Sequence, residues 1–208
     1  MDGEERKQLI DKYRLVLSSV PLESTDVLME LIEAEDPYTQ GHSLRVADYS
    51  EMIAIKAGLS ETEVKDIRYE AVLHDIGKIG ICDEILSKPY ELSDEEYASV
   101  QKHTIIGAYI LSDIDNLPWA KYVAKYHHER YDGKGYPDGL RGEEIPLHAR
   151  IVAIADAYDA MNTDRAYRKS LSASIIKEEL EKGKGTQFDP YLTELFLAVT
   201  FDNEYPDR

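Results

Sequence analysis

Apolar residues recur along most of the chain at spacings of three and four, which place side chains on one face of an α-helix. The pattern is clear in residues 28–32 and again in residues 44–55, where we expect two helices. Pro37 disfavours helical backbone angles at Asp36. We therefore expect a turn between these helices and a second helix that begins at His42.

Two further helix starts carry a capping signal. Ser60 is followed three residues later by a glutamate, and Ser93 is followed directly by three acidic residues. A serine hydroxyl and early carboxylates satisfy the free amide groups and the positive end of a helix. We expect the first of these helices to end at His74 and Asp75, and the second to carry His103 in its interior.

The rest of the chain is divided by proline, glycine and serine at further helix starts. A glycine-rich stretch at residues 132–139 predicts a long loop. No segment alternates apolar and polar residues in the way that a half-buried strand does. The fold class is therefore predicted to be all-α, with additional helices towards the C-terminus. The remaining helices are expected to begin near Pro118, leading into His127 and His128, near Pro146, leading to Asp156, and near Ser172 and Pro190.

Residues 4–20 form the first predicted helix, with an apolar stripe that includes Leu9, Tyr13 and Leu17. The stripe could belong to a dimer seam or to a connection from an upstream domain. We favour packing on the core of the same domain. The chain is accordingly divided into an N-terminal helix or connector, residues 1–24, and one domain, residues 25–208.

Composition narrows the classes of protein to which the chain can belong. It contains 41 acidic residues against 24 lysines and arginines, a formal charge of −17, which disfavours binding to a nucleic-acid polymer. The longest apolar run, residues 105–111 with one glycine inside it, is far shorter than the roughly 20 residues of a membrane span. The single cysteine, Cys82, cannot form an internal disulfide. We expect a cytoplasmic globular protein without a membrane segment.

Five of the six histidines have neighbours that suggest chemistry. One helical histidine alone is more often structural than a ligand, but a set of imidazoles with carboxylates can bind divalent metals, and a carboxylate can bridge two ions. The lone cysteine excludes a cysteine-rich structural zinc site, so an open site of the hydrolytic kind is predicted. The sixth histidine, His148, is expected at the surface or at a helix start. The five are His42, His74, His103, His127 and His128.

The run HDIGK, residues 74–78, places three chemical types close together. A histidine and an aspartate at one helix end can hold metal, and Lys78 can reach an anionic group held beside Asp75. The alternative is a solvent-exposed lysine without a chemical role.

Several long motifs occur together: DPYTQGHSLRV, HDIGKIGICDEIL, HHERYDGKGYPDGLRGEEIP, ARIVAIADAYDAM followed by DRAYR, and GTQFDP. In these motifs and their order the sequence resembles the HD-GYP family, a branch of the HD-domain metal-dependent phosphohydrolases that act on cyclic dinucleotides. The resemblance covers roughly residues 25–200. It implies an HD-domain helical bundle in which Gly135-Tyr136-Pro137, the GYP element, lies in a loop.

The resemblance also implies two divalent metal ions, with iron or manganese favoured, and a hydroxide shared between them as the nucleophile. Relatives with a third ion carry a glutamate where this chain has Tyr38, so we expect two ions. Asp75 would bridge them. The implied ligands are His42, His74, Asp75 and Asp156 for one ion and Asp75, His103, His127 and His128 for the other.

Substrate contacts are implied for the GYP loop and for residues on either side of it. Arginine suits a phosphodiester because its guanidinium donates two parallel hydrogen bonds. Alternatively, Arg165 forms a structural ion pair with Asp159 or Asp164, and the GYP element is a simple turn. The implied catalytic residues are Asp75 and Lys78, and the implied substrate-binding residues are Asp36, Gly135, Tyr136, Pro137, Arg165 and Arg168.

The implied activity is hydrolysis of cyclic di-GMP to linear pGpG, with or without further cleavage to GMP. A second hypothesis is a hydrolase of another cyclic dinucleotide such as cyclic GMP-AMP, because the motifs specify metal and phosphate but hardly the base. A third is a weakly active module that senses nucleotide, which is disfavoured because every ligand position is filled. A homodimer or an upstream sensory domain would be compatible with each hypothesis.

Overall fold

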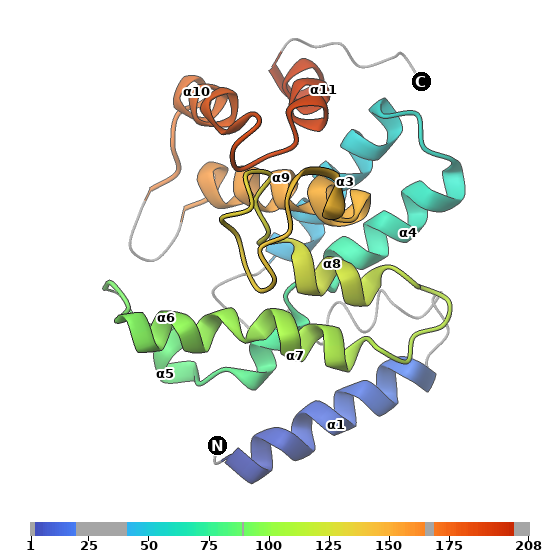
Figure 1. Ribbon diagram of the computed structural model, residues 1–208, viewed down its shortest axis with the longest axis vertical. Helices are drawn as coiled ribbons and strands as arrows, with labels where there is room; N and C mark the ends of the chain where they lie inside the picture. Colours follow the sequence, from blue (N-terminus) through green and yellow to red (C-terminus); the bar gives the residue numbers. More distant parts are fainter. Residues whose placement is uncertain (1–2, 20–40, 89, 165–168, 202–208) are drawn as a thin grey trace.

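The computed structural model describes residues 3–19, 41–88, 90–164 and 169–201, and within them the elements are helical (Figure 1). The all-α prediction is confirmed. The expectations for the helix at residues 28–32 and for Asp36, Tyr38, Arg165 and Arg168 fall outside the described residues. The helices are α1 Gly3–Ser19, α3 His42–Lys56, α4 Glu61–Val72, η2 Ile76–Gly80, α5 Asp83–Leu86, α6 Asp94–Gln101, α7 His103–Ile110, α8 Ala120–Tyr126, η3 Gly142–Glu144, α9 Leu147–Asn162, α10 Ala173–Gly183 and α11 Pro190–Phe201.

Capping chemistry sets several of these boundaries as the sequence predicts. Ser60 and Ser93 each accept a hydrogen bond from the backbone of a glutamate three residues later, whose carboxylate bonds back to the serine amide. Asp189 caps α11, because its Oδ1 accepts from the amides of Tyr191 (2.9 Å) and Leu192 (3.1 Å). The free amides of these helix starts are therefore satisfied within the chain.

The prediction that His103 lies in the interior of a helix is wrong. The structure has two helices there, α6 and α7, which are separated at Lys102. His103 is consequently the first residue of α7. Lys102 itself keeps helical backbone angles (φ −63°, ψ −18°), so the break is confined to one residue and the local apolar pattern does not reveal it.

Buried apolar side chains form three clusters. One lies among α3, α4, α9, α10 and α11 and includes Ile53, Ile154 and Phe196, and another joins α1, α7 and α8 around Leu111. The third consists of small residues between α3, α4, α8 and α9: Val46, Ala47, Ala71, Val72, Val123, Val152 and Ala155. Small side chains let these four helices approach closely, and all four carry or adjoin predicted metal ligands.

α1 packs along α7 and η2 at one end of the molecule (Figure 1). Leu17 is buried, and Arg14 pairs with Asp113 at 2.7 Å. The favoured interpretation of this segment, packing on the core, agrees with these contacts. None of the described helices is long and apolar enough to cross a lipid bilayer.

Candidate metal centre

The seven predicted ligands lie in two adjoining groups, and six of the seven stand at or beside helix ends. Within each group, one ligand atom from every residue lies within 4.8 Å of the others. The one ligand that does not stand at a helix end is Asp156, which lies inside α9. The groups are Asp75, His103, His127 and His128, and His42, His74 and Asp156.

Helix ends allow neighbouring residues to serve one site. Within a helix, successive side chains diverge by about 100°, so two adjacent residues cannot both face the same point. His74 and Asp75 lie between α4 and η2, and His127 and His128 follow the last residue of α8. Both dipeptides therefore place two side chains at the centre.

A close backbone contact holds η2 against α7. A Cβ atom added at Gly77 would overlap the carbonyl oxygen of His103 and lie 2.5 Å from the amide nitrogen of Gly107. Only glycine permits this approach. The contact fixes the segment that carries Asp75 against the helix that begins with His103.

Asp75 lies between the two ligand groups. Its Oδ2 is 3.3 Å from Nε2 of His74, and its Oδ1 is 3.4 Å from Nε2 of His103 and 3.7 Å from Nε2 of His127. His74 belongs to one group, whereas His103 and His127 belong to the other. Asp75 therefore presents one oxygen to each group.

Four of the histidines have Nδ1 bonded to an acceptor outside the cluster. Such a bond places the ring proton on Nδ1 and leaves the Nε2 lone pair free to bind a metal. The hydrogen bonds consequently aim the Nε2 atoms into the centre. The acceptors are the carbonyls of Ala71 for His74 (2.6 Å), Val100 for His103 (2.7 Å) and Val123 for His127 (3.0 Å), and the carboxylate of Asp159 for His42 (2.7 Å).

The convergence of these electron-pair donors fits a cation. Nε2 of His103 is 3.4 Å from Nε2 of His127. Among the described residues, Nε2 of His74 and Oδ1 of Asp75 are buried without a hydrogen-bond partner. Unsatisfied buried polar atoms are costly, and nitrogen and oxygen donors of this kind bind divalent transition metals. The donor set therefore fits divalent metal ions.

Burial and charge set the protonation of the centre in the metal-free protein. Burial lowers the pKa of His103 to about 4 and holds the pKa of His128 well below its usual range. Burial opposes ionisation of Asp75, but Lys78 and His74 outweigh it and hold the pKa of this carboxyl well below its ordinary value. At neutral pH the two imidazoles are therefore neutral and Asp75 is ionised, the states that bind metal.

His42 differs from these histidines. Burial opposes its protonation, but hydrogen bonds with Asp156 and Asp159 outweigh burial and raise the pKa of His42 to about 9. Its Nε2 lies 3.3 Å from Oδ1 of Asp156. A metal that binds to this Nε2 must therefore displace a proton.

Asp159 is a residue whose contribution the sequence does not reveal. It is 1% exposed, and while Oδ2 bonds to His42, Arg45 donates from Nε to Oδ1 at 2.6 Å and from Nη2 to Oδ2 at 3.0 Å. The guanidinium thus fixes the carboxylate that orients the His42 ring. Arg165, the alternative partner of Asp159, lies outside the described residues.

Replacing Asp159 with asparagine is expected to weaken metal binding by about 10- to 100-fold, the usual effect of losing a carboxylate that orients a metal-binding histidine. Isothermal titration calorimetry with Mn²⁺ measures the change. Asp48→Asn is the matched control, because Asp48 also pairs with an arginine, Arg68, but does so on the exposed side of α3. Equal affinities for wild type and Asp159→Asn would contradict the orienting function.

Lys78 lies at the edge of the centre. Its Nζ donates to Oδ2 of Asp75 at 2.5 Å, and its side chain is 30% exposed. The lysine thus combines a fixed position with access to solvent. It is placed to meet an anionic group that arrives beside Asp75.

The GYP loop covers one side of the centre through Tyr136. The Tyr136 ring stacks on His128 with ring centroids 4.9 Å apart, and Pro137 follows it in the loop. Gly135 has a packing function, because an added Cβ would overlap the amide of Arg130 and lie 2.5 Å from Cα of Glu129. The loop is therefore more than a simple turn.

Two further contacts hold the GYP loop, and neither was expected from the sequence. Buried Glu129 accepts from the amides of Asp138 (2.8 Å) and Gly139 (2.9 Å) through Oε1. The GTQFDP segment, residues 185–190, contributes two backbone carbonyls. That of Thr186 accepts from the amide of Asp132 at 2.8 Å, and that of Gln187 accepts from the amide of Tyr131 at 3.2 Å. The glutamate directly after the histidine pair gives no local sign that it anchors this loop, because the amides that it binds lie 9 and 10 residues further along the chain.

His148 is not a surface residue. It lies in the first turn of α9, which agrees with the expected position at a helix start. Its side chain is buried, with 7% exposed, and its Nδ1 is 2.6 Å from Oε2 of buried Glu70. The apolar flanks of His148 gave no sign of this partner. The pair joins α4 to α9. His74 follows α4, and Asp156 lies in α9.

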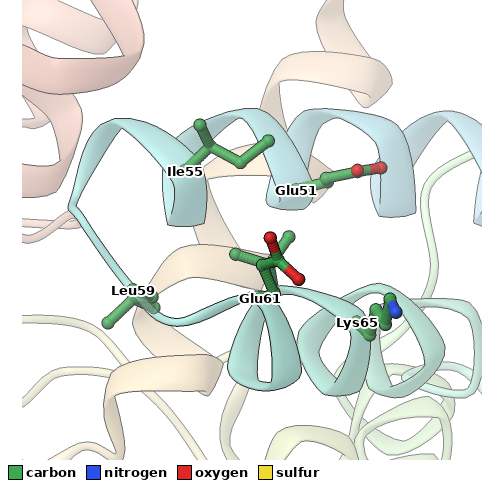
Figure 2. A pocket seen from close by; sticks show the side chains of 6 residues that line it. Glu51, Ile55, Leu59, Glu61 and Lys65 are labelled. Atoms are coloured by element: carbon green, nitrogen blue, oxygen red, sulfur yellow. The ribbon is translucent and has the colours of Figure 1, made fainter.

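A separate hollow lies between α3 and α4 (Figure 2). Glu51 and Ile55 face it from α3, and Glu61 and Lys65 from α4. The described residues that line it include none of the seven predicted ligands. The hollow is therefore distinct from the metal centre.

The fold and the site together define a class of all-α proteins, in which helix ends gather histidines and aspartates that could hold metal ions. Residues 26–192 match the family model described as HD domain, and the chain belongs to this family. It is 42% identical to the 3'3'-cGAMP-specific phosphodiesterase 2 of Vibrio cholerae over 82% of this chain and 33% of the relative. It is also 42% identical to a cyclic di-GMP phosphodiesterase of Thermotoga maritima, over 85% of this chain and 49% of the relative. These matches confirm the resemblance to the HD-GYP family.

The fold is shared with a solved structure. The crystal structure of a cyclic GMP-AMP specific phosphodiesterase of Vibrio cholerae superposes with a TM-score of 0.64 at 19% identity, over 92% of this chain and 49% of that chain. The chain spans half or less of the length of these relatives.

Proposed function

We propose that this chain is a metal-dependent phosphodiesterase that hydrolyses cyclic di-GMP to pGpG, with or without cleavage onward to GMP. The observation that carries the proposal is Asp75, which presents one carboxylate oxygen to each of two histidine groups. That arrangement suits two ions that share a ligand. The names of the relatives from Vibrio cholerae and Thermotoga maritima, which act on 3'3'-cGAMP and cyclic di-GMP, support a cyclic dinucleotide as the substrate class.

We propose two divalent ions, iron or manganese, as the cofactors. Bound ions would lower the pKa of water and offset negative charge on a phosphoryl oxygen. Asp75 would contact both ions. The remaining ligands would be His42, His74 and Asp156 on one side and His103, His127 and His128 on the other.

The surrounding residues would bind and orient the phosphodiester. Lys78 would donate to a phosphoryl oxygen as negative charge grows during the reaction. Arg165 and Arg168 would hold phosphate, Asp36 would contact the substrate, and the GYP loop would line the cleft through Tyr136 and Pro137. We keep the division into a connector, residues 1–24, and a phosphohydrolase domain, residues 25–208, as part of the proposal.

A hydrolase of cyclic GMP-AMP is the second candidate. Its support is the 42% identity to a relative named for specificity towards 3'3'-cGAMP. Product chromatography with cyclic di-GMP and 3'3'-cGAMP in parallel tests both candidates on the manganese- or iron-loaded protein. We expect pGpG from cyclic di-GMP at the higher kcat/KM. A higher value with 3'3'-cGAMP would favour the second candidate, and no hydrolysis of either would overturn the proposal.

Metal analysis of freshly purified protein is expected to give close to two ions per chain, because Tyr38 stands where relatives with a third ion carry a carboxylate. Inductively coupled plasma mass spectrometry gives both the number and the identity of the ions. A value near three would mean that another residue, such as Asp36, supplies the missing ligand.

Lys78→Ala and Arg165→Ala are expected to differ in their kinetics. If Lys78 acts on charge that develops in the transition state, its loss lowers kcat and kcat/KM together. If Arg165 holds phosphate throughout the reaction, its loss chiefly raises KM, by an amount equivalent to about 2–3 kcal/mol. Steady-state kinetics with parallel metal analysis measure both effects.

Neither residue is a proposed ligand, so the metal content of both variants should equal that of wild type. An unchanged kcat in Lys78→Ala would remove this lysine from the mechanism. An unchanged KM in Arg165→Ala would return Arg165 to a structural ion pair.

A further inference from the structure

An aromatic path leads outwards from the metal centre. The Tyr136 ring stacks on His128, with 4.9 Å between ring centroids and 29° between ring planes. Tyr97, on α6, contacts Tyr136 edge to face at 6.3 Å and 80°. The path therefore runs from the predicted ligand His128 through half-buried Tyr136 to the more exposed Tyr97.

Tyr136 is held close to the charged groups of the centre. Burial, and then the nearness of Tyr97, Asp75 and Asp156, raises the pKa of the Tyr136 phenol, so it remains protonated. Its stacking partner His128 occupies one face of its ring. Tyr136 is thus fixed between the ligands and Tyr97.

Tyr97 is the open end of this path. It is 50% exposed although it touches a ring that lies against a metal ligand. An edge-to-face contact leaves at least one face of the Tyr97 ring uncovered by Tyr136. A flat apolar surface is therefore available beside a centre that suits phosphate.

We propose that Tyr97 is the base-stacking residue of the substrate cleft. One nucleobase of the cyclic dinucleotide lies on the open face of Tyr97 while a phosphodiester is held at the metal centre, a placement that rests on the proposed function. Nucleobases stack on aromatic side chains whatever their hydrogen-bonding edges, and each such contact contributes substantially to binding. Tyr97 therefore binds the nucleobase, while the metal centre binds the phosphate.

Comparison of GMP with inorganic phosphate isolates the base. Isothermal titration calorimetry on the manganese-loaded protein should show that Tyr97→Ala weakens GMP binding by about 5- to 150-fold, equivalent to about 1–3 kcal/mol. Phosphate affinity and metal content should stay at wild-type values. Tyr97→Phe, which keeps the ring, should bind GMP within about threefold of wild type.

Tyr191→Ala is the matched control, since Tyr191 is a 60% exposed tyrosine on α11, which Figure 1 shows well apart from α6. It should leave all these affinities unchanged. In turnover of cyclic di-GMP, Tyr97→Ala should raise KM by a similar factor and leave kcat unchanged.

Two results would overturn the assignment. GMP binding that is unchanged in Tyr97→Ala would show that no base lies on the ring. Equal weakening of GMP and phosphate would show that Tyr97 only supports Tyr136 and the centre. If wild type hydrolyses no cyclic dinucleotide, the proposed function fails, but the calorimetric comparison of GMP with phosphate still decides whether Tyr97 binds a base.

Discussion

Replacing Asp75 with alanine is expected to abolish hydrolysis of cyclic di-GMP and to leave the purified protein with less than one metal ion per chain. The reason is that Asp75 presents one oxygen to each ligand group, at 3.3 Å from His74 and at 3.4 Å from His103. Water in the place of this carboxylate would supply neither its charge nor its fixed geometry. Product chromatography and elemental analysis of the same preparation measure both losses.

Asp83→Ala is the control for Asp75→Ala, because Asp83 is an exposed aspartate eight residues further along the chain. It should keep wild-type activity and metal content. Far-ultraviolet circular dichroism should be the same for both variants and wild type, which separates loss of metal from loss of fold. Near-normal metal content and turnover in Asp75→Ala would contradict a site built on a shared carboxylate.

Gly77→Ala is expected to lower the free energy of unfolding by about 3 kcal/mol or more, a large effect for one methyl group. The added Cβ would overlap the carbonyl oxygen of His103 and crowd the amide of Gly107, and both are backbone atoms that cannot move aside. η2 would have to leave α7, which separates Asp75 from His103. Urea unfolding of the metal-free protein measures the stability, and metal analysis measures the separation.

Gly3→Ala is the comparison for Gly77→Ala, because a Cβ at Gly3 would meet no atom within 4 Å. Its effect on the free energy of unfolding should stay within about 0.5 kcal/mol. A Gly77→Ala protein that unfolds at the wild-type urea concentration would show that the close approach of η2 to α7 is not required.

Local signals in the sequence were sufficient for most helix boundaries. Ser60 and Ser93 supply their own caps, and Pro190 begins α11 as expected, because the atoms that decide these starts lie within one helical turn. The break at Lys102 was missed. Both sides of that break are helical, and Lys102 between them keeps helical backbone angles, so no local signal in the sequence marks the break.

The same distinction applies to the site. The seven proposed ligands are implied by the resemblance to the HD-GYP family, and the structure brings these residues into two groups. The residues that orient them could not be predicted, because Asp159 is 117 residues from His42 and carboxylates are common on an acidic chain. The function of Glu129 could not be predicted either, because it binds two backbone amides of a loop whose path the sequence does not give.

The backbone hydrogen bonds between Asp132 and Thr186 and between Tyr131 and Gln187 have a consequence for cooperativity. They tie the loop that carries Tyr136 to the segment between α10 and α11. The amides of Tyr131 and Asp132 exchange with solvent only when these hydrogen bonds break, that is, when the two segments separate. The GYP loop is therefore coupled to the segment between α10 and α11, and a partner that displaces this segment would also release the loop that carries Tyr136.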